Sequence, residues 1–313
     1  MRLLVTADLH YNHAASRPLA DELIDRMNAA RPDAVLVVGD TAAGDGDDLE
    51  RCLGRFACDG PKLFVAGNHE LWTRGPDSHA LFTQDLPRRV RAAGWHWLEG
   101  DAVALDHGVA VAGTVGWYDY AFALPHLGIP RRFYEAKVSP AAAERLAEHA
   151  HLLDRVDDVT EAGRQVAARW NDGRHVKLHR TDEAFLAERL AALAGQLDRL
   201  EADPGVRAVV AAVHHVPFEA LMPPKPPPTF VSGRAFAGAF LGSPAIGDLL
   251  LRYPKVRRVY CGHSHLPAAG TVGHVQGVNV GSGYRWKTFV EVDTAEVGGA
   301  EVAGAEVGGA EVA

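Results

Sequence analysis

The chain has 313 residues, of which 47% are hydrophobic, so it is long enough for one large α/β domain or two smaller ones with a substantial core. Its formal net charge is −8 and stays negative when the glutamates after residue 295 are left out, which argues against a dedicated nucleic-acid binder that neutralises many phosphates. It has three cysteines without a C-x-x-C pair and no run of roughly 18 apolar residues, so we expect a cytoplasmic protein without a membrane partner.

Apolar, β-branched runs and helical spacing of apolar residues predict alternating strands and helices. The first run, Arg2–Ala7, is too short for a secretory signal because Asp8 and His10 interrupt it. The predicted strands are Arg2–Ala7, Ala34–Val38, Lys62–Ala66, Val103–Leu105, Val109–Gly113, Ala208–Val213, Val256–Cys261, Val278–Val280 and Phe289–Val292. The predicted helices are Pro18–Ala30, Asp77–Ala92, Pro140–Arg155, Thr181–Ala202 and Ala239–Arg252. Alternation up to residue 94 favours a largely parallel sheet, and the closely spaced strands that follow favour a second sheet with hairpins.

We expect one domain over residues 1–294, followed by a low-complexity tail at 295–313. Residues 117–240 contain a cap-like insertion, in which residues 117–205 break the rhythm of strands and helices and are interpreted as a cap rather than another crossover. The stretch Pro223–Phe230, PPKPPPTF, predicts a stiff polyproline II loop on the surface. The tail repeats GGAEV and AGAEV, has nothing large to bury, and is expected to be disordered.

Each of the five strongest apolar runs is followed by residues that can bind a cation. These residues are Asp8-Leu9-His10, Asp40, Asn68-His69-Glu70, His214-His215 and His263-Ser264-His265. Because the carboxyl ends of strands in an open α/β sheet converge on one crevice, we expect the five exits to meet. Gly39, Gly67 and Gly262 each precede a candidate ligand, where the missing Cβ permits a sharp bend. A mixture of Asp, Asn and His suits Mn²⁺, Fe or Zn²⁺ better than Ca²⁺.

The motifs resemble, in order, those of the calcineurin-like metallophosphoesterase superfamily. They are DLH at 8–10, GD at 39–40, GNHE at 67–70, VHHVP at 213–217 and GHSH at 262–265, and together they span most of the chain. The resemblance implies an α/β fold, a four-layer αββα sandwich, with a dinuclear metal centre between the loops. The expected cofactors are two divalent or trivalent ions, Mn²⁺ or Fe in the first place and Zn²⁺ as the alternative.

Carried over position by position, the resemblance also implies a ligand set. The first metal would take Asp8, His10, Asp40 and His265, and the second would take Asp40, Asn68, His263 and one histidine of the pair His214-His215, of which His214 is favoured. Asp40 would bridge the two ions. The resemblance implies that His69 faces the scissile phosphate as general acid or charge stabiliser. Glu70 is expected to orient His69 or a backbone amide.

The resulting hypothesis is a hydrolase of phosphomonoesters or phosphodiesters. Two cations roughly 3.5–4 Å apart can share a hydroxide that attacks phosphorus in line and can clamp the phosphate oxygens. The substrate would be a small molecule or a phosphoprotein. The alternatives are a nuclease of the same fold, which the acidic body disfavours, and a non-catalytic metal-binding scaffold, which the complete set of motifs disfavours.

Several other residues are candidates for substrate contacts. His215, Asn12 and Tyr284 would lie near the site, and Arg285 could pair either with a phosphate oxygen or with a surface carboxylate. Trp117 and Tyr118 fit either a substrate wall or the core. The pair His175-x-x-x-His179 is interpreted as solvated surface histidines, since no third ligand lies near it in the sequence.

Overall fold

Two mixed β-sheets form the centre of the molecule in the computed structural model, which describes residues 1–227, 229 and 231–299. The first sheet has the order β11 (Phe289–Asp293), β1 (Arg2–Thr6), β2 (Ala34–Val38), β3 (Lys62–Val65) and β4 (His96–Trp97). The second has the order β5 (Val103–Ala104), β6 (Val109–Thr114), β7 (Ala208–Val213), β8 (Val256–Cys261), β10 (Val275–Asn279) and β9 (Ala268–Val272). The inner strands of both sheets are parallel, and β11, β5 and β9 pair antiparallel at the edges.

The sheets pack face to face, and alternate residues of each strand point to different layers. Leu3 and Val5 of β1 join the cluster between the sheets, whereas Leu4 joins the cluster under the helices. Val111 and Ala112 of β6 divide in the same way. Both faces of these strands are therefore buried, which is why they read as continuous apolar runs in the sequence.

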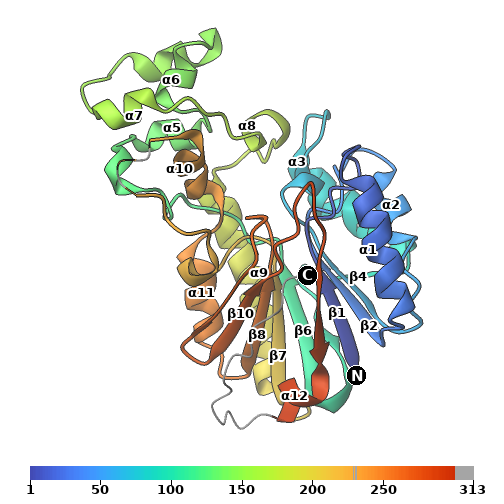
Figure 1. Cartoon of the computed structure of the whole chain (residues 1–313). Helices are drawn as coiled ribbons and strands as arrows, with labels where there is room; N and C mark the ends of the chain where they lie inside the picture. Colours follow the sequence, from blue (N-terminus) through green and yellow to red (C-terminus); the bar gives the residue numbers. More distant parts are fainter. Residues whose placement is uncertain (228, 230, 300–313) are drawn as a thin grey trace.

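Helices cover the outer face of each sheet, so the fold is the expected four-layer αββα sandwich (Figure 1). The helices next to the first sheet are α1 (Arg17–Ala29), α2 (Asp48–Leu53) and α4 (Leu86–Ala92). The second sheet is covered by α9 (Asp182–Ala202), which contacts β6, and by α11 (Pro244–Leu251), which contacts α9. No helix of the described residues is long and apolar enough to cross a membrane.

The helix α9 was expected to belong to the cap, and this interpretation is wrong. It connects the parallel neighbours β6 and β7, so it is a crossover of the sandwich, and residues 117–240 also contain β7 itself. Most of the chain outside the sandwich lies between β6 and α9, and the short helix before α11 lies beside it (Figure 1). The helices between β6 and α9 are short: η4 (Pro125–Leu127), α5 (Arg131–Glu135), α6 (Pro140–Ala143), η5 (Ala147–Leu153), α7 (Glu161–Gln165) and α8 (Asp172–His175). We call residues 117–180 the insertion.

Three predicted helices have different boundaries in the structure. The stretch Pro140–Arg155 divides into α6 and η5, since helix propensity decides little where tertiary contacts are few. The stretch Asp77–Ala92 divides into α3 (Ser78–Ala80), a π-helical turn η2 (Leu81–Asp85) and α4, with Pro87 in the first turn of α4. The predicted helix Ala239–Arg252 begins at Pro244 instead, where the Ser243 side chain caps α11. Before it lie α10 (Gly233–Ala237) and η7 (Gly238–Phe240).

The end of the described chain is ordered rather than a free tail. Residues 294–299 form α12 (Thr294–Gly299), and Val297 is 4% exposed in the cluster between the sheets. The prediction of disorder is therefore wrong for residues 295–299, because Val297 is buried and the helix contacts β6 and the turn at residues 106–108. Residues 300–313, the rest of the predicted tail, lie outside the described residues. The sequence also missed β4 and β9, which are a two-residue strand and one arm of a hairpin.

Candidate metal centre

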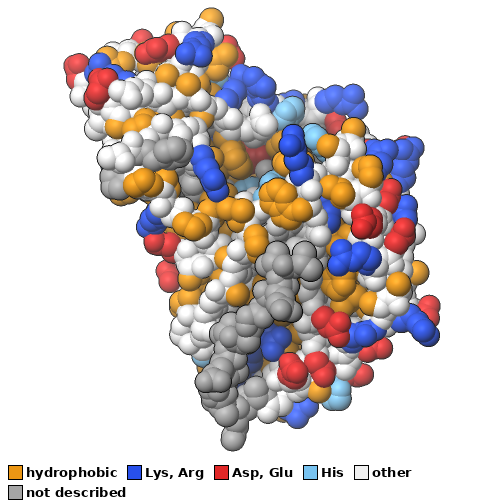
Figure 2. All heavy atoms as spheres, viewed as in Figure 1, with side chains coloured by type: hydrophobic (Ala, Val, Ile, Leu, Met, Phe, Trp, Pro, Cys, Tyr) orange, Lys and Arg blue, Asp and Glu red, His pale blue; other side chains and the backbone are white. Residues whose placement is uncertain are grey.

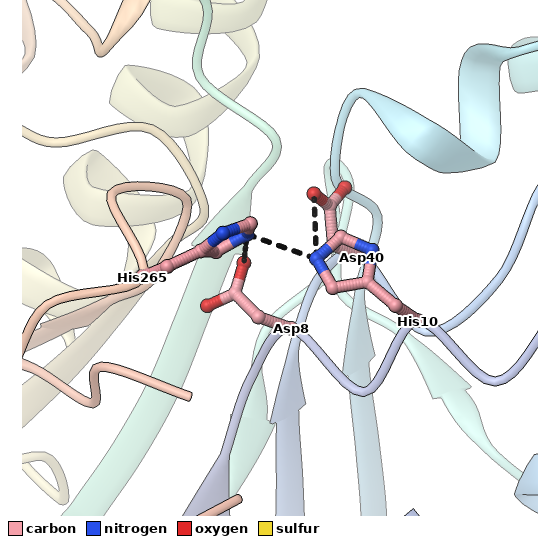
Figure 3. A group of neighbouring side chains, drawn as sticks. All are labelled: Asp8, His10, Asp40 and His265. Carbon is pink, nitrogen blue, oxygen red and sulfur yellow. Dashed lines mark hydrogen bonds and ion pairs between the residues drawn. The ribbon is translucent and has the colours of Figure 1, made fainter. Parts of the chain in front are cut away.

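The first group of candidate ligands combines the ends of three strands. Asp8, His10, Asp40 and His265 each offer one donor atom, and these atoms lie within 4.8 Å of one another. Nε2 of His10 is 2.9 Å from Nε2 of His265, which in turn is 3.6 Å from Oδ1 of Asp8 (Figure 3). Two imidazole nitrogens and two carboxylates that point at one spot can hold a single cation.

The second group shares Asp40 with the first. Donor atoms of Asp40, His214 and His263 lie within 4.8 Å of one another. Nε2 of His214 is 3.3 Å from Oδ1 of Asp40 and 3.1 Å from Nδ1 of His263. Oδ1 of Asn68 lies 3.4 Å from the same His214 nitrogen. The structure thus brings together all seven residues that the sequence proposed as ligands, and it places Asp40 between the two groups.

The structure distinguishes the two adjacent histidines. Nδ1 of His214 lies 3.0 Å from the backbone oxygen of Val38, a contact that puts the proton on Nδ1 and leaves the Nε2 lone pair for the group around Asp40. Nδ1 of His215 instead lies 2.8 Å from the backbone oxygen of Val115, and its Nε2 is buried without a hydrogen-bond partner in the structure. His214 is therefore the better candidate ligand, while His215 packs beside His263 at a ring separation of 4.4 Å.

Most candidate ligands have a backbone conformation that residues other than glycine rarely adopt. Five of them have positive φ: Asp8 (54°), His10 (44°), Asp40 (53°), His263 (68°) and His265 (58°). Such left-handed residues persist only where the surrounding structure holds them, and they cluster at functional sites. Here the backbone amide of His10 donates to the backbone oxygen of Asp40 at 2.8 Å, and the backbone amide of His263 donates to Oδ1 of Asp8 at 2.9 Å. The strand-end loops therefore fix one another.

The glycines that precede three ligands are required mainly by close approach. A Cβ on Gly67 would lie 2.2 Å from Oδ1 of Asp40, and one on Gly262 would lie 2.4 Å from Oδ2 of Asp8. Gly39 meets both conditions, since its φ is +79° and a Cβ would lie 2.4 Å from Nδ1 of His214. The expected freedom of the backbone thus applies to Gly39, and space for a ligand explains the other two.

Glu70 holds the loop that carries Asp40. Its carboxylate accepts hydrogen bonds from four backbone amides: Asp40 at 2.9 Å, Thr41 at 2.6 Å, Ala42 at 3.0 Å and Gly67 at 2.6 Å. Burial, together with the nearby Asp40, raises the pKa of Glu70 to about 7. Glu70 therefore orients backbone amides, which is one of the two roles expected for it, and not the ring of His69.

His69 lies on the same loop, next to the two groups. Its ring stacks on Trp72 with centroids 3.7 Å apart, and Nε2 lies 3.8 Å from Oδ2 of Asp40. Trp72 is stacked in turn on His175, one of the histidines that we expected to be solvated surface residues. Burial lowers the pKa of His69, while the carboxylates of Asp40 and Asp172 oppose that shift. The ring is thus held rigidly at the edge of the centre.

Asp172, on α8 of the insertion, is a site residue that the sequence did not suggest. It is 1% exposed and accepts hydrogen bonds from four side chains. The donors are Nδ2 of Asn68 at 2.8 Å, Nε1 of Trp72 at 2.6 Å, the hydroxyl of Tyr118 at 3.0 Å and Nε1 of Trp170 at 2.7 Å. By binding the amide nitrogen of Asn68, it turns the amide oxygen toward the second group.

Lys287 is a second site residue that the sequence did not suggest, because its partners are backbone atoms. Its Nζ donates to the backbone oxygens of Asp8 at 2.6 Å and Gly283 at 2.7 Å. Burial lowers the pKa of Lys287 to about 8, while the charge of Asp8 opposes the shift. Lys287 therefore places a cation directly behind the first group.

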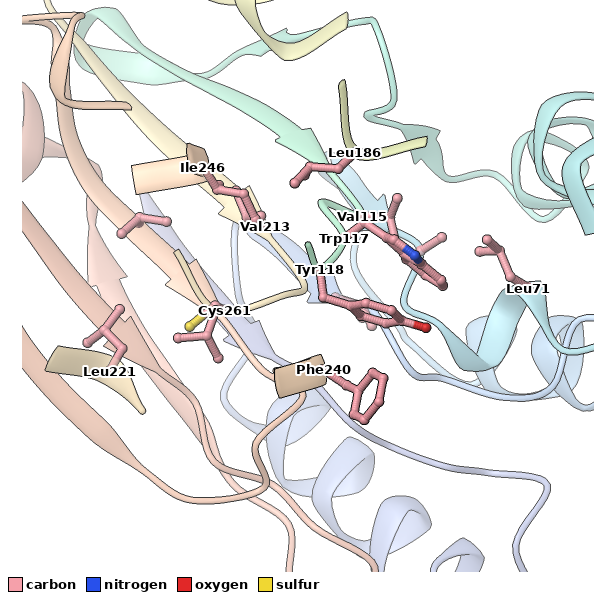
Figure 4. Packing of buried hydrophobic residues seen from close by; sticks show 14 of the residues in the cluster. Leu71, Val115, Trp117, Tyr118, Leu186, Val213, Leu221, Phe240, Ile246 and Cys261 are labelled. Atoms are coloured by element: carbon pink, nitrogen blue, oxygen red, sulfur yellow. The ribbon is translucent and has the colours of Figure 1, made fainter. Parts of the chain in front are cut away.

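The proposed substrate contacts differ in their positions. Tyr284 stacks on His10 with ring centroids 4.3 Å apart and lines the cavity described below. Arg285 and Asn12 are exposed and do not line it, and Oδ1 of Asn12 accepts a hydrogen bond from the amide of Ala43. Trp117 and Tyr118 are fully buried and belong to the core, where Tyr118 packs beside Phe240 (Figure 4).

The protonation of the buried groups fits a cation site. Burial lowers the pKa of His10 and of His263 well below the usual histidine value, and that of His265 to about 4, so these imidazoles are neutral donors. Burial works in the opposite direction on Asp40, but His214 and His69 hold the pKa of its carboxyl well below the usual range. His214 differs, because burial opposes the change but Asp40 and Asp8 raise its pKa to about 9, so a metal ion would have to displace a proton from this ring.

A cavity of about 480 Å³ opens over the centre (Figure 2). Its base includes Asp40, Asn68, His69, His263 and His265. Its walls come from the insertion, from the predicted polyproline loop and from α10 and η7. A cavity of this size encloses ligands considerably larger than inorganic phosphate.

Comparison with known proteins agrees with this geometry. The family model described as calcineurin-like phosphoesterase matches residues 1–267. The fold is similar to the crystal structure of a phosphopantetheinyl hydrolase from Mycobacterium tuberculosis, with 22% identity, 90% of this chain and 89% of that chain covered, and a TM-score of 0.59. It is also similar to a dimetal phosphatase from Danio rerio, with 15% identity, 93% and 91% covered, and a TM-score of 0.51. The search of curated proteins found no match. The match of a single family model to most of the chain shows that this protein belongs to the calcineurin-like phosphoesterase family.

Proposed function

We propose that this protein is a metal-dependent hydrolase of phosphate esters with a dinuclear centre. The first ion would be held by Asp8, His10, Asp40 and His265, and the second by Asp40, Asn68, His214 and His263. One observation carries the proposal: side chains as far apart in the sequence as Asp8 and His265 form two groups that share Asp40.

The donor set fits two ions of the kind expected. Oδ1 of Asp40 faces His214 at 3.3 Å, and Oδ2 faces His10 at 3.9 Å, so one carboxylate reaches both groups. Mixed imidazole, carboxylate and amide donors suit Mn²⁺, Fe and Zn²⁺. When bound, such ions activate water for attack on phosphorus and neutralise charge on the phosphate oxygens.

The chain's own residues would orient the substrate and handle the leaving group. Hydrolysis joins the oxygen of water to phosphorus and breaks the bond to the alcohol oxygen, which must take up a proton. His69 lines the cavity beside Asp40, and its stack on Trp72 fixes the direction of its ring. His69 is therefore the proposed donor to the departing oxygen, a role worth typically 10²–10⁴-fold in rate.

The substrate is proposed to be a small-molecule or phosphoprotein phosphate ester. The net charge of −8 favours it over the nuclease alternative, since a protein that binds a polynucleotide neutralises many phosphates with basic side chains. The names of the two structural neighbours suggest substrates for testing, a phosphopantetheinyl ester and simple phosphomonoesters.

The experiment that tests the proposal measures metal content and hydrolysis together. Purified protein is stripped with a chelator, titrated with Mn²⁺, Fe²⁺ or Zn²⁺, and assayed with p-nitrophenyl phosphate, bis(p-nitrophenyl) phosphate and single-stranded DNA. We expect two ions per chain and hydrolysis that appears with them. Two bound ions without hydrolysis of any of these compounds would favour the scaffold alternative, and cleavage of DNA alone would favour the nuclease.

A further inference from the structure

The walls of the cavity carry cations that the metal centre does not use. Asp40, at the base, is the only acidic side chain among the lining residues, whereas Arg169, Lys225 and Arg234 are basic. Arg169 lies 3.6 Å from Glu148, and Lys225 pairs with Glu219. Arg234 is exposed and has no ion pair among the described residues. Arg234 is therefore the basic side chain of this wall whose charge is available to an anionic group of a ligand.

The rest of the wall is apolar and largely aliphatic. Its apolar side chains are Phe122, Leu124, Met222, Leu241, Ala235, Ala237, Trp170 and the prolines at 223, 224 and 226. The prolines make part of the wall stiff before any ligand binds, which lowers the entropy lost on binding.

The aromatic rings of the cavity are poorly placed to stack on a flat ligand. Trp72 is covered on both sides, by His69 at 3.7 Å and by His175 at 4.8 Å between ring centroids. Tyr284 stacks on His10 at 4.3 Å, and Trp170 lies parallel to Phe240 at 5.2 Å. Both faces of Trp72 are thus covered, and one face each of Tyr284 and Trp170 is covered by a neighbouring ring. An alkyl chain needs only contact area, whereas a nucleobase needs a free ring face.

We propose that the natural substrate is a phosphate ester of an elongated aliphatic alcohol that carries a second negative charge toward its far end. The phosphate would occupy the base of the cavity, the chain would lie along the aliphatic wall, and the second anion would pair with Arg234. This inference rests on the proposed phosphoesterase function and names the substrate class of the same site.

Four esters with different organic groups test the substrate class: ethyl phosphate, octyl phosphate, 8-phosphonooxyoctanoate and adenosine 5′-phosphate. Each is offered as a monoester and as its p-nitrophenyl diester, so that the result does not depend on which ester type is cleaved. We expect kcat/KM to rise on the order of tenfold from ethyl to octyl, and several-fold further with the terminal carboxylate. Equal or faster hydrolysis of the ethyl or adenosine esters would overturn the proposal.

The variant Arg234→Gln tests the second charge. The ratio of kcat/KM for the octanoate ester to that for the octyl ester should fall toward one in Arg234→Gln and remain unchanged in the control Arg88→Gln, an exposed arginine paired with Asp85 away from the cavity. An unchanged ratio in Arg234→Gln would refute the role of Arg234. If none of the esters is hydrolysed by protein loaded with two ions, it is the proposed phosphoesterase function that fails.

Discussion

The loops at the strand ends and the insertion differ in how their residues are held. Most of the candidate ligands are buried, and five of them have positive φ. The insertion instead consists of short helical turns, and it lends the cavity a few side chains such as Phe122, Leu124 and Arg169. The first region is held by mutual contacts of its backbone, whereas in the second the residues that line the cavity can change at small cost. The comparison leads us to propose that the chemistry belongs to the strand-end loops, and that selectivity for the substrate belongs to walls from the insertion and from residues 222–241.

The largest expected effect is the removal of the carboxylate that both groups share. Asp40→Ala should abolish loading of both ions and hydrolysis together, because Asp40 is the only residue common to the two groups. Metal content by mass spectrometry and turnover are the measurements. Asp85→Ala, which removes an exposed carboxylate elsewhere, is the control. Two tightly bound ions in Asp40→Ala would show that the strand-end loops do not form the centre.

His69 should separate metal binding from chemistry. His69→Ala should keep two ions and lower kcat by about 10²–10⁴-fold, since His69 belongs to neither ligand group. The exposed His151, changed to Ala, is the control. Unchanged turnover in His69→Ala would remove its assigned role.

Asp172 tests whether the insertion contributes to the centre as well as to the walls. Asp172→Asn should weaken binding of the second ion by about 10–100-fold, because Asn68 would lose the acceptor that orients its amide. Calorimetric titration of the metal-free protein measures this without any assay of activity.

The matched control is Asp182→Asn. Asp182 is also buried and accepts hydrogen bonds from Trp117 and Lys137 and from the hydroxyl of Tyr120, but it contacts no candidate ligand. Both variants should lower the melting temperature, and only Asp172→Asn should change metal affinity. Equal losses of affinity would mean that Asp172 supports the fold and nothing more.

The smallest effects are expected at Arg285 and Asn12. Arg285→Gln and Asn12→Ala should each change kcat/KM by less than about twofold, since neither side chain lines the cavity. A larger change in steady-state kinetics would mean that the substrate extends beyond the cavity toward these residues.

The sequence predicted the centre because each ligand follows a buried strand directly. Asp8, Asp40 and His263 stand where an apolar run ends, and parallel strands bring such positions to one edge. Asp172 gave no such signal, because three of its four donors, Asn68, Trp72 and Tyr118, lie at least 54 positions away and meet it only through folding. The role of α9 was hidden by the long insertion before it, which separated the crossover from the strand that it follows. The positive φ of the ligands also escaped prediction, since Asp and His adopt it more often than most residues but still only rarely.

The left-handed backbone of the candidate ligands makes metal binding part of the folding equilibrium. Each such residue costs about 1–3 kcal/mol, and the buried groups around Asp40 add to that cost in the absence of a cation. An ion that binds only the folded chain stabilises the folded state and offsets this cost. Removal of the ions with a chelator should consequently lower the unfolding temperature of this protein, while both sheets stay folded below that temperature.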